Sequence, residues 1–353
     1  MRVIRSIRIR SGAPYDVKIS RGCLSGAGES LRALTDPDRV CVVTDSRVRP
    51  LWVPALSRSL EKAGIPCDVF SFPAGERSKT LSTFADAAAF FLKSGLTRKS
   101  AVLALGGGVT MDLTGFAAAC YHRGIPWAAL PTTFLSAVDA SVGGKTGVDL
   151  PGSKNALGVF SQPALVLCDP GTFITLGEER WRDGAAESLK HGLIGDAALF
   201  ETMLRPWRQR LEDVIAANIL VKRAFVEADE RDRGIRQLLN FGHTVGHAVE
   251  ALSGYTMSHG RCVAIGMLAE TRAAWRMGFG SVMPQTVKSA LTACGLPTEC
   301  PFDTDAVLSA ALHDKKRAGS RITVAALSRL GEGFLQELTL DEFGAFLRAG
   351  LEP

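Results

Sequence analysis

The chain has 353 residues, 46% hydrophobic and 22% charged, which is the composition of a globular protein long enough for two domains. No apolar run approaches the roughly 18 residues that cross a bilayer, so the sequence predicts no membrane-spanning helix. The net charge of +5 comes without a long basic run or interleaved aromatic residues, which argues against nucleic acid as a partner.

The eight cysteines are scattered, and no two form a Cys-x-x-Cys pair. Cys41, Cys120 and Cys168 lie in apolar runs, as small buried hydrophobic residues do in a reducing compartment. The first ten residues alternate like an exposed strand and lack the apolar stretch of a signal peptide. We therefore expect a cytoplasmic protein.

The first half of the chain alternates short apolar runs with amphipathic segments. The predicted strands are 39–45, 67–72, 101–105, 127–130 and 165–168, and the predicted helices between them are 50–64 and 81–93. The run at 101–105 is apolar throughout, as in a strand covered on both faces. This alternation predicts a parallel α/β sheet.

The second half carries mainly helical periodicity. The predicted helices are 178–190, 197–210, 211–228, 243–252 and 259–277, followed by a lone short strand at 321–327. The sequence therefore predicts a Rossmann-like parallel-sheet α/β domain over residues 1–175. A mainly α-helical domain is predicted over residues 176–353.

Three of the six histidines lie close together, at His243, His247 and His259. His243 and His247 are four residues apart and share one face of a helix. The alternative to a functional site is a set of packed core histidines. Because glycines that permit close approach flank all three, the cluster favours a metal or proton-transfer site.

Glu187 and Lys190 are three residues apart on a predicted helix, so they lie on one face. They form either a surface ion pair or a functional pair. In the second case, Glu187 and two histidines would make the mixed nitrogen and oxygen ligand set of a catalytic zinc. Lys190 would then hold a substrate oxygen.

The segment Gly106–Asp112 follows the apolar strand at 101–105 and begins a helix. Glycines let a phosphate approach the backbone, and a helix N-terminus supplies N–H donors, so the segment is either a tight turn or a pyrophosphate site. Its place at the carboxyl end of a parallel strand favours the ligand.

A second glycine-rich segment carries Asp139, Lys145 and the pair Lys154–Asn155. Lysine offers a point charge to phosphate and Asp139 can accept a sugar hydroxyl, which indicates a phosphorylated polyol; the alternative is a mobile surface loop. A nicotinamide cofactor and a metal beside such a site would support oxidation of a hydroxyl by hydride transfer.

Longer motifs resemble one family, the 3-dehydroquinate synthases, in the same order and at similar spacing. The matching segments are Gly106–Gly124, Pro131–Asp149, Gly152–Asn155, Gly184–Gly192, Asp229–Glu250, Ser258–Gly260 and Asp314–Lys316. Several are long unbroken matches, so the motifs are specific as a set. The resemblance extends from about Val40 to Lys316.

This resemblance implies a homodimeric enzyme of the shikimate pathway, which leads to chorismate and the aromatic amino acids. Its cofactors would be NAD and Zn²⁺ or Co²⁺, and its substrate a phosphorylated sugar acid, 3-deoxy-D-arabino-heptulosonate 7-phosphate. NAD oxidises the C5 hydroxyl transiently and phosphate leaves by β-elimination. The ketone is then reduced, the ring opens, and an intramolecular aldol reaction forms 3-dehydroquinate.

The resemblance also implies roles for individual residues. The implied zinc ligands are Glu187, His243 and His259, with His247 as a proton-transfer group. The positions that resemble NAD contacts are Asp45, Glu76, Lys79, Gly107, Gly108, Val109, Asp112, Thr132, Thr133, Lys145 and Lys154. The positions that resemble substrate contacts are Asp139, Lys145, Asn155, Lys190, Lys222, Arg236, Asn240 and Lys315. Arg123 resembles an arginine that reaches the substrate phosphate of the partner subunit.

Four positions depart from the family pattern. Met111 replaces a glycine beside the presumed pyrophosphate turn, so its side chain must point away from NAD. Ala137 replaces a glutamine, and Asp232 is one methylene shorter than the usual glutamate. Arg261 replaces the glutamate that follows His-Gly, which bears on the charge near a presumed zinc ligand.

Three other functions fit parts of this pattern. Related sugar phosphate cyclases of the amino-dehydroquinate or valiolone type share the NAD and metal sites. Lys222, Arg236 and Asn240 favour a substrate with a carboxylate, which argues against the valiolone type but leaves the amino analogue. A metal-dependent polyol dehydrogenase would not need the Lys145 and Lys154 cluster. A non-catalytic relative would not need to retain every metal, lysine and NAD position.

Overall fold

The computed structural model describes residues 5–315 and 321–352, without the side chains of 313–315. The chain divides into two compact units, which we name unit 1 (Met1–Leu176) and unit 2 (Gly177–Pro353). In the described ranges, no helix is both long and apolar enough to span a membrane.

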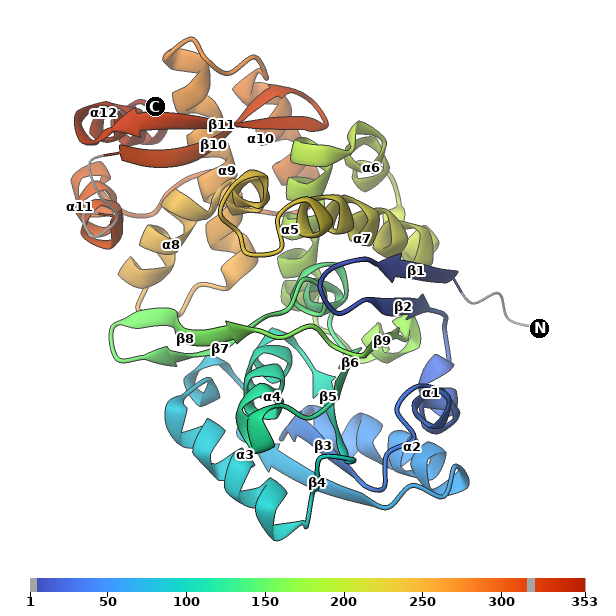
Figure 1. Cartoon of the computed structure of the whole chain (residues 1–353). Helices are drawn as coiled ribbons and strands as arrows, with labels where there is room; N and C mark the ends of the chain where they lie inside the picture. Colours follow the sequence, from blue (N-terminus) through green and yellow to red (C-terminus); the bar gives the residue numbers. More distant parts are fainter. Residues whose placement is uncertain (1–4, 316–320, 353) are drawn as a thin grey trace. The chain divides into compact units, whose positions relative to one another are not determined.

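Unit 1 contains a seven-stranded sheet among its described residues, in the order β1-β2-β9-β6-β5-β3-β4 (Figure 1). The strands are β1 (Arg5–Ile9), β2 (Tyr15–Ile19), β3 (Val40–Asp45), β4 (Cys67–Phe72), β5 (Ala101–Gly106), β6 (Trp127–Pro131) and β9 (Leu165–Cys168). All neighbours pair in parallel except β1 and β2. The predicted parallel sheet is confirmed, although β2 was not predicted.

The helices of unit 1 are α1 (Ala27–Leu34), α2 (Val48–Lys62), α3 (Leu81–Lys93) and α4 (Gly108–Cys120). Apolar side chains of α1 and α2 pack against β3, β5, β6 and β9 in one core. α3 and α4 contact each other through stacked Phe84 and Phe116, whose ring centroids are 4.7 Å apart.

The lysine-containing segment after β6 is ordered as an antiparallel hairpin of β7 (Lys145–Leu150) and β8 (Ser153–Phe160). Lys145, Lys154 and Asn155 therefore lie in paired strands and not in a loop. α4 packs closely on β7, because a Cβ atom at Gly115 would lie 2.4 Å from Cγ2 of Thr146. The hairpin's glycine and charge content, with Gly147, Gly158, Lys145 and Lys154 in the two strands, resembles that of a loop.

Unit 2 is mainly helical, as predicted. Its helices are α5 (Glu178–Gly195), α6 (Ala197–Met203), α7 (Leu211–Ala228), α8 (His243–Leu252), α9 (His259–Arg276), α10 (Pro284–Ala293), α11 (Thr304–Lys315) and α12 (Leu340–Leu351). Two predictions were wrong in detail. The helix predicted at 197–210 ends at Met203, shortly before Pro206, which disfavours helical conformation at the preceding residue. The strand predicted as solitary, β10 (Arg321–Arg329), pairs with β11 (Glu332–Thr339).

Glycines bring α8 and α9 into close contact. A Cβ atom at Gly266 would lie 1.9 Å from the carbonyl oxygen of Gly242 and 2.8 Å from the nitrogen of Gly246. Apolar residues of both helices then share one core with Phe343 and Phe346 of α12. This packing places the first residues of α8 and α9, both histidines, on neighbouring elements.

Candidate metal centre and cofactor site

Glu187 is the buried carboxylate of the candidate metal centre. It lies on α5 with no solvent exposure, and its Oε2 forms an ion pair with Nζ of Lys190, which is 1% exposed. Its Oε1 lies 3.7 Å from Nε2 of His243 and 3.5 Å from Nε2 of His259. The surface-pair alternative is therefore wrong: Glu187 and Lys190 form a buried pair, with one carboxylate oxygen turned toward two imidazoles.

Two backbone arrangements bring the histidines to Glu187. His243 begins α8, directly after Gly242, whose φ of 78° is left-handed. His259 begins α9, where Gly260 donates its N–H to Oδ1 of Asp183 at 3.1 Å. A Cβ atom at Gly260 would lie 2.4 Å from Cα of Asp183, so only glycine allows this approach to α5. Asp183 lies one helical turn before Glu187 on α5.

The three side chains suit a divalent transition metal. One potential ligand atom from each of Glu187, His243 and His259 lies within 4.8 Å of the others. One carboxylate and two imidazoles form the donor set of many catalytic zinc sites, with positions left for substrate. The described residues therefore fit Zn²⁺ or Co²⁺.

The surroundings shift the pKa of each of the three groups, and they do so in different directions. Burial alone would raise the pKa of Glu187, but Lys190 and the two histidines hold it well below its usual range. Burial, reinforced by Lys190, lowers the pKa of His243 well below its ordinary value, so its imidazole is neutral at neutral pH. Burial would also lower the pKa of His259, but Glu187 and Glu250 raise it to about 10. A metal ion must therefore displace a proton from His259.

His247 and Glu250 form a second group of potential ligands with His259. Potential ligand atoms of His247, Glu250 and His259 also come within 4.8 Å of one another. Nδ1 of His259 is 3.7 Å from Oε2 of Glu250, whereas Nε2 faces Glu187. The two carboxylates thus face opposite nitrogens of one imidazole. His247 is exposed, and its ring centroid is 5.2 Å from that of His243.

Sequence reasoning missed two buried carboxylates that support the histidines, Glu250 and Glu270. Glu270 of α9 is 1% exposed and accepts the backbone N–H groups of Gly242, Thr244 and Val245 at 2.7, 3.0 and 3.2 Å. It satisfies N–H groups in the first turn of α8, which lacks a side-chain cap from its own N-cap residue. An acidic residue within an otherwise apolar helical stretch was the available signal.

The predicted carboxylate-binding residues lie on elements adjoining this centre. Lys222 is buried on α7, and Arg236 is 1% exposed with Nη1 donating to the carbonyl of Glu230 at 2.6 Å. Asn240 is exposed at the end of the 3₁₀ turn Ile235–Asn240, two residues before Gly242. The side chain of Lys315 lies outside the described residues.

Unit 1 gathers several predicted NAD positions around Lys79, which is 4% exposed. Its Nζ is 2.5 Å from Oδ2 of Asp112 and also contacts the amide oxygen of Asn155. Nearby in sequence, Nζ of Lys154 is 3.1 Å from Oε1 of Glu76. The structure thus brings residues of a 3₁₀ turn, α4 and β8 together in one polar cluster.

The glycine segment after β5 forms the predicted turn from strand to helix. Gly107 is the N-cap residue of α4, which then starts with Gly108 and Val109, and it provides no capping side chain. Thr132 Oγ1 is buried, with no hydrogen-bond partner in the described part of the chain. Thr133 Oγ1 shares a 2.8 Å hydrogen bond with Oγ of Ser136.

Other predicted positions in unit 1 have separate surroundings. Asp45 accepts the N–H groups of Arg47 and Val48 at 2.8 and 3.0 Å, so one of its oxygens caps α2. Asp139 is half-buried in a π-helical turn, and Lys145 is exposed at the start of β7. Arg123 is exposed in a left-handed conformation, with φ of 67°.

The four departures from the family pattern lie in different surroundings. Met111 and Ala137 are both fully buried in unit 1. The Met111 side chain therefore occupies core space, as NAD binding requires of it. Arg261 is exposed on α9, and Asp232 is half-buried with a left-handed φ of 58°.

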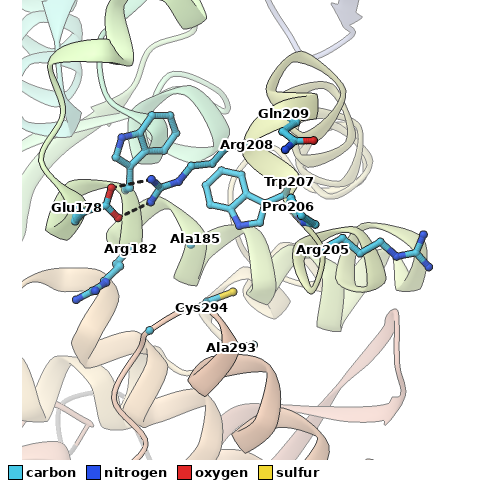
Figure 2. A pocket seen from close by; sticks show the side chains of 12 residues that line it. Glu178, Arg182, Ala185, Arg205, Pro206, Trp207, Arg208, Gln209, Ala293 and Cys294 are labelled. Carbon is cyan, nitrogen blue, oxygen red and sulfur yellow. Dashed lines mark hydrogen bonds and ion pairs between the residues drawn. The ribbon is translucent and has the colours of Figure 1, made fainter.

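A cavity of about 480 Å³ occurs elsewhere in unit 2 (Figure 2). Arg208 lines this cavity. Its guanidinium donates to both carboxylate oxygens of Glu178 at 2.8 Å and lies 4.7 Å from the ring centroid of Trp181. None of the predicted site residues lines this cavity. The guanidinium of Arg208 is thus already paired with Glu178. We assign this cavity no catalytic role.

Known proteins place the chain in a family. Sequence models for the N-terminal and C-terminal parts of 3-dehydroquinate synthase match residues 69–183 and 184–317. A 3-dehydroquinate synthase of Streptococcus suis is 40% identical over 347 residues, covering 95% of this chain and 97% of the relative.

Solved structures agree on the fold. A 2-deoxy-scyllo-inosose synthase complexed with carbaglucose-6-phosphate, NAD⁺ and Co²⁺ has a TM-score of 0.86 and 24% identity, covering 98% of this chain and 100% of its own. The 2-epi-5-epi-valiolone synthase ValA of Streptomyces hygroscopicus, with NAD⁺ and Zn²⁺ bound, has a TM-score of 0.84 and 26% identity. The match covers 97% of this chain and 98% of the ValA chain. With the sequence matches, these findings show that the chain belongs to the 3-dehydroquinate synthase family.

Proposed function

We propose that Glu187, His243 and His259 hold the catalytic divalent metal of a 3-dehydroquinate synthase. The enzyme converts 3-deoxy-D-arabino-heptulosonate 7-phosphate into 3-dehydroquinate and phosphate, and uses NAD and Zn²⁺ or Co²⁺. The observation that carries the ligand assignment is the approach of both Nε2 atoms to one oxygen of a fully buried carboxylate. Three elements of unit 2 supply this set.

Each cofactor has a defined task when bound: NAD accepts and returns a hydride, and the metal ion acidifies the hydroxyl that is oxidised. Lys190 neutralises Oε2 of Glu187 and offers its ammonium to a substrate oxygen. His247, exposed beside His243, transfers a proton during elimination or ring closure. Lys222, Arg236 and Asn240 hold the substrate carboxylate.

Unit 1 is proposed to bind NAD. The N–H groups at Gly107, Gly108 and Val109 offer donors to the pyrophosphate at the start of α4, where the helix dipole favours an anion. The other proposed contacts are Asp45, Glu76, Lys79, Asp112, Thr132, Thr133, Lys145 and Lys154. Among them, the buried Thr132 hydroxyl supports the proposal because NAD would give it a hydrogen-bond partner.

The remaining substrate contacts are proposed at Asp139, Lys145, Asn155 and, outside the described side chains, Lys315. Arg123 is proposed to reach the substrate phosphate of a partner subunit in a homodimer, and its exposure supports that role. A cytoplasmic location also stays a prediction. The eight free cysteines are consistent with it.

Phosphate release tests the function. Purified enzyme is incubated with the heptulosonate phosphate and a catalytic amount of NAD, with and without a chelator. We expect many phosphates released per NAD, and loss of release after chelation. Stoichiometric accumulation of NADH would instead indicate a polyol dehydrogenase. Faster turnover of the amino analogue would indicate an amino-dehydroquinate synthase.

A further inference from the structure

The two candidate imidazole ligands present the same ring nitrogens to their surroundings. Each turns Nε2 toward Oε1 of Glu187, at 3.7 Å for His243 and 3.5 Å for His259. Each turns Nδ1 toward an acceptor. For His243 the acceptor is the backbone carbonyl of Phe241, at 3.2 Å, and for His259 it is Oε2 of Glu250, at 3.7 Å. In metal sites, the group at the second ring nitrogen fixes the tautomer and orientation of a histidine ligand.

Burial of the Glu250 carboxylate is energetically unfavourable unless a partner offsets it. Glu250 lies on α8 and is only 4% exposed. It is seven residues, or about two helical turns, after His243, so both point to the same face of α8. That face meets the start of α9, where His259 lies.

We infer that Glu250 is a positioning residue for the metal centre. Its negative charge favours the proton on Nδ1 of His259, which leaves the lone pair of Nε2 directed at the metal beside Glu187. Removal of Glu250 would free the ring to rotate and to change tautomer. This inference rests on the proposed ligand assignment, and its role is indirect because Glu250 acts through His259.

The position of Glu250 also bears on Arg261, which stands where the family pattern has a glutamate. Residues 259 and 261 are two apart on α9, and such residues do not share a helix face. Arg261 is exposed, whereas the carboxylate that faces His259 comes from α8. The loss of an acidic residue at position 261 therefore leaves the negative charge beside Nδ1 in place.

Metal affinity and cobalt spectroscopy test this role. Zinc affinity is measured by competition with a chelator for the full chain and for the variants Glu250→Ala and Glu250→Gln. The control is Glu201→Gln, because Glu201 is exposed on α6. Loss of an outer partner of a histidine ligand costs about 10–100-fold in metal affinity, so we expect this loss for Glu250→Ala and a smaller one for Glu250→Gln. The visible absorption of the Co²⁺-loaded variants should shift, and that of the control should not.

The outcomes are separable from the ligand assignment. Wild-type zinc affinity and an unchanged Co²⁺ spectrum in Glu250→Ala would overturn the inference, provided that Glu187→Gln loses zinc. If Glu187→Gln keeps stoichiometric zinc and Glu250→Ala loses it, Glu250 is itself a ligand and both proposals fail. If Glu250→Ala does not fold, Glu250→Gln decides: an affinity equal to that of Glu201→Gln overturns the inference.

Discussion

Each unit buries a lysine against a carboxylate, but the two pairs differ in what the partners leave available. In unit 1, Lys79 contacts both Asp112 and Asn155, so one cation joins two acceptors. In unit 2, Lys190 contacts one oxygen of Glu187, and the other oxygen faces two imidazoles. The first arrangement holds chain segments together around a cation. The second presents a preformed set of electron-pair donors.

The difference shows that a buried ion pair does not by itself indicate a metal site. The position of the second carboxylate oxygen, and the bases that face it, decide whether a divalent ion fits. Variants in the Lys79 cluster should therefore leave zinc content unchanged, and variants in the metal centre should leave NAD affinity unchanged.

The largest effect is expected for His259→Ala. This change removes one of the three proposed ligands, so the enzyme should lose stoichiometric zinc. Activity should fall at least about 1,000-fold, because metal stabilisation contributes several kcal/mol. Elemental analysis and phosphate release measure both. Circular dichroism should show a folded protein. A variant that retained one zinc per chain would contradict the ligand assignment.

Lys79→Met tests the other cluster. It leaves Asp112 without its buried cation, which should lower the free energy of unfolding by about 3 kcal/mol. NAD affinity should fall as well, whereas zinc content should not change. Thermal unfolding, NAD titration and elemental analysis are the measurements. Loss of zinc would show that the two clusters do not act independently.

Lys222→Ala separates substrate from cofactor. A charged hydrogen bond is worth about 1.5–3 kcal/mol, so KM for the heptulosonate phosphate should rise about 10–100-fold while the Kd for NAD stays near the wild-type value. Steady-state kinetics and NAD titration give the two numbers. Equal losses for substrate and NAD would argue against contact with the carboxylate.

Gly260→Ala tests the approach of α9 to α5. The added Cβ would meet the Asp183 backbone at 2.4 Å, and overpacking of this kind costs about 1–3 kcal/mol. Because His259 adjoins Gly260, zinc affinity should fall, by about 5- to 150-fold where this whole cost falls on metal binding. Gly344→Ala on α12 is the control, since no heavy atom lies within 4 Å of its added Cβ. Equal zinc affinities in the two variants would refute this geometry.

The smallest effect is expected for Arg261→Glu, which introduces the acidic residue typical of the family. Because position 261 does not face the His259 ring, chelator competition should show less than about a twofold change in zinc affinity. A tenfold gain would show that an acid at this position acts on the metal.

The sequence predicted the elements, and pointed to the candidate ligands, whose signals are local. The apolar run before Gly106 predicted β5, and the helical periodicity after Glu178 predicted α5. His243 and His259 were found because rare residue types cluster within one stretch. Glu187 was proposed because it lies three residues from Lys190 on a predicted helix and completes a ligand set with two histidines, and the family motif around it supports that proposal.

The rest depends on tertiary packing. Glu250 looks like an ordinary polar residue of an amphipathic helix until α8 lies against α9. Glu270 gains its role only when the first turn of α8 comes within reach of α9. The β7–β8 hairpin and the pairing of β10 with β11 join segments whose glycine and charge content resembles that of loops.

The most direct test of the central proposal is an anomalous diffraction map from a crystal of the Co²⁺-loaded enzyme. We predict one strong peak, about 2.0–2.2 Å from a Glu187 oxygen and from Nε2 of both His243 and His259. A peak on the Nδ1 side of His259, between His247 and Glu250, would contradict the assignment.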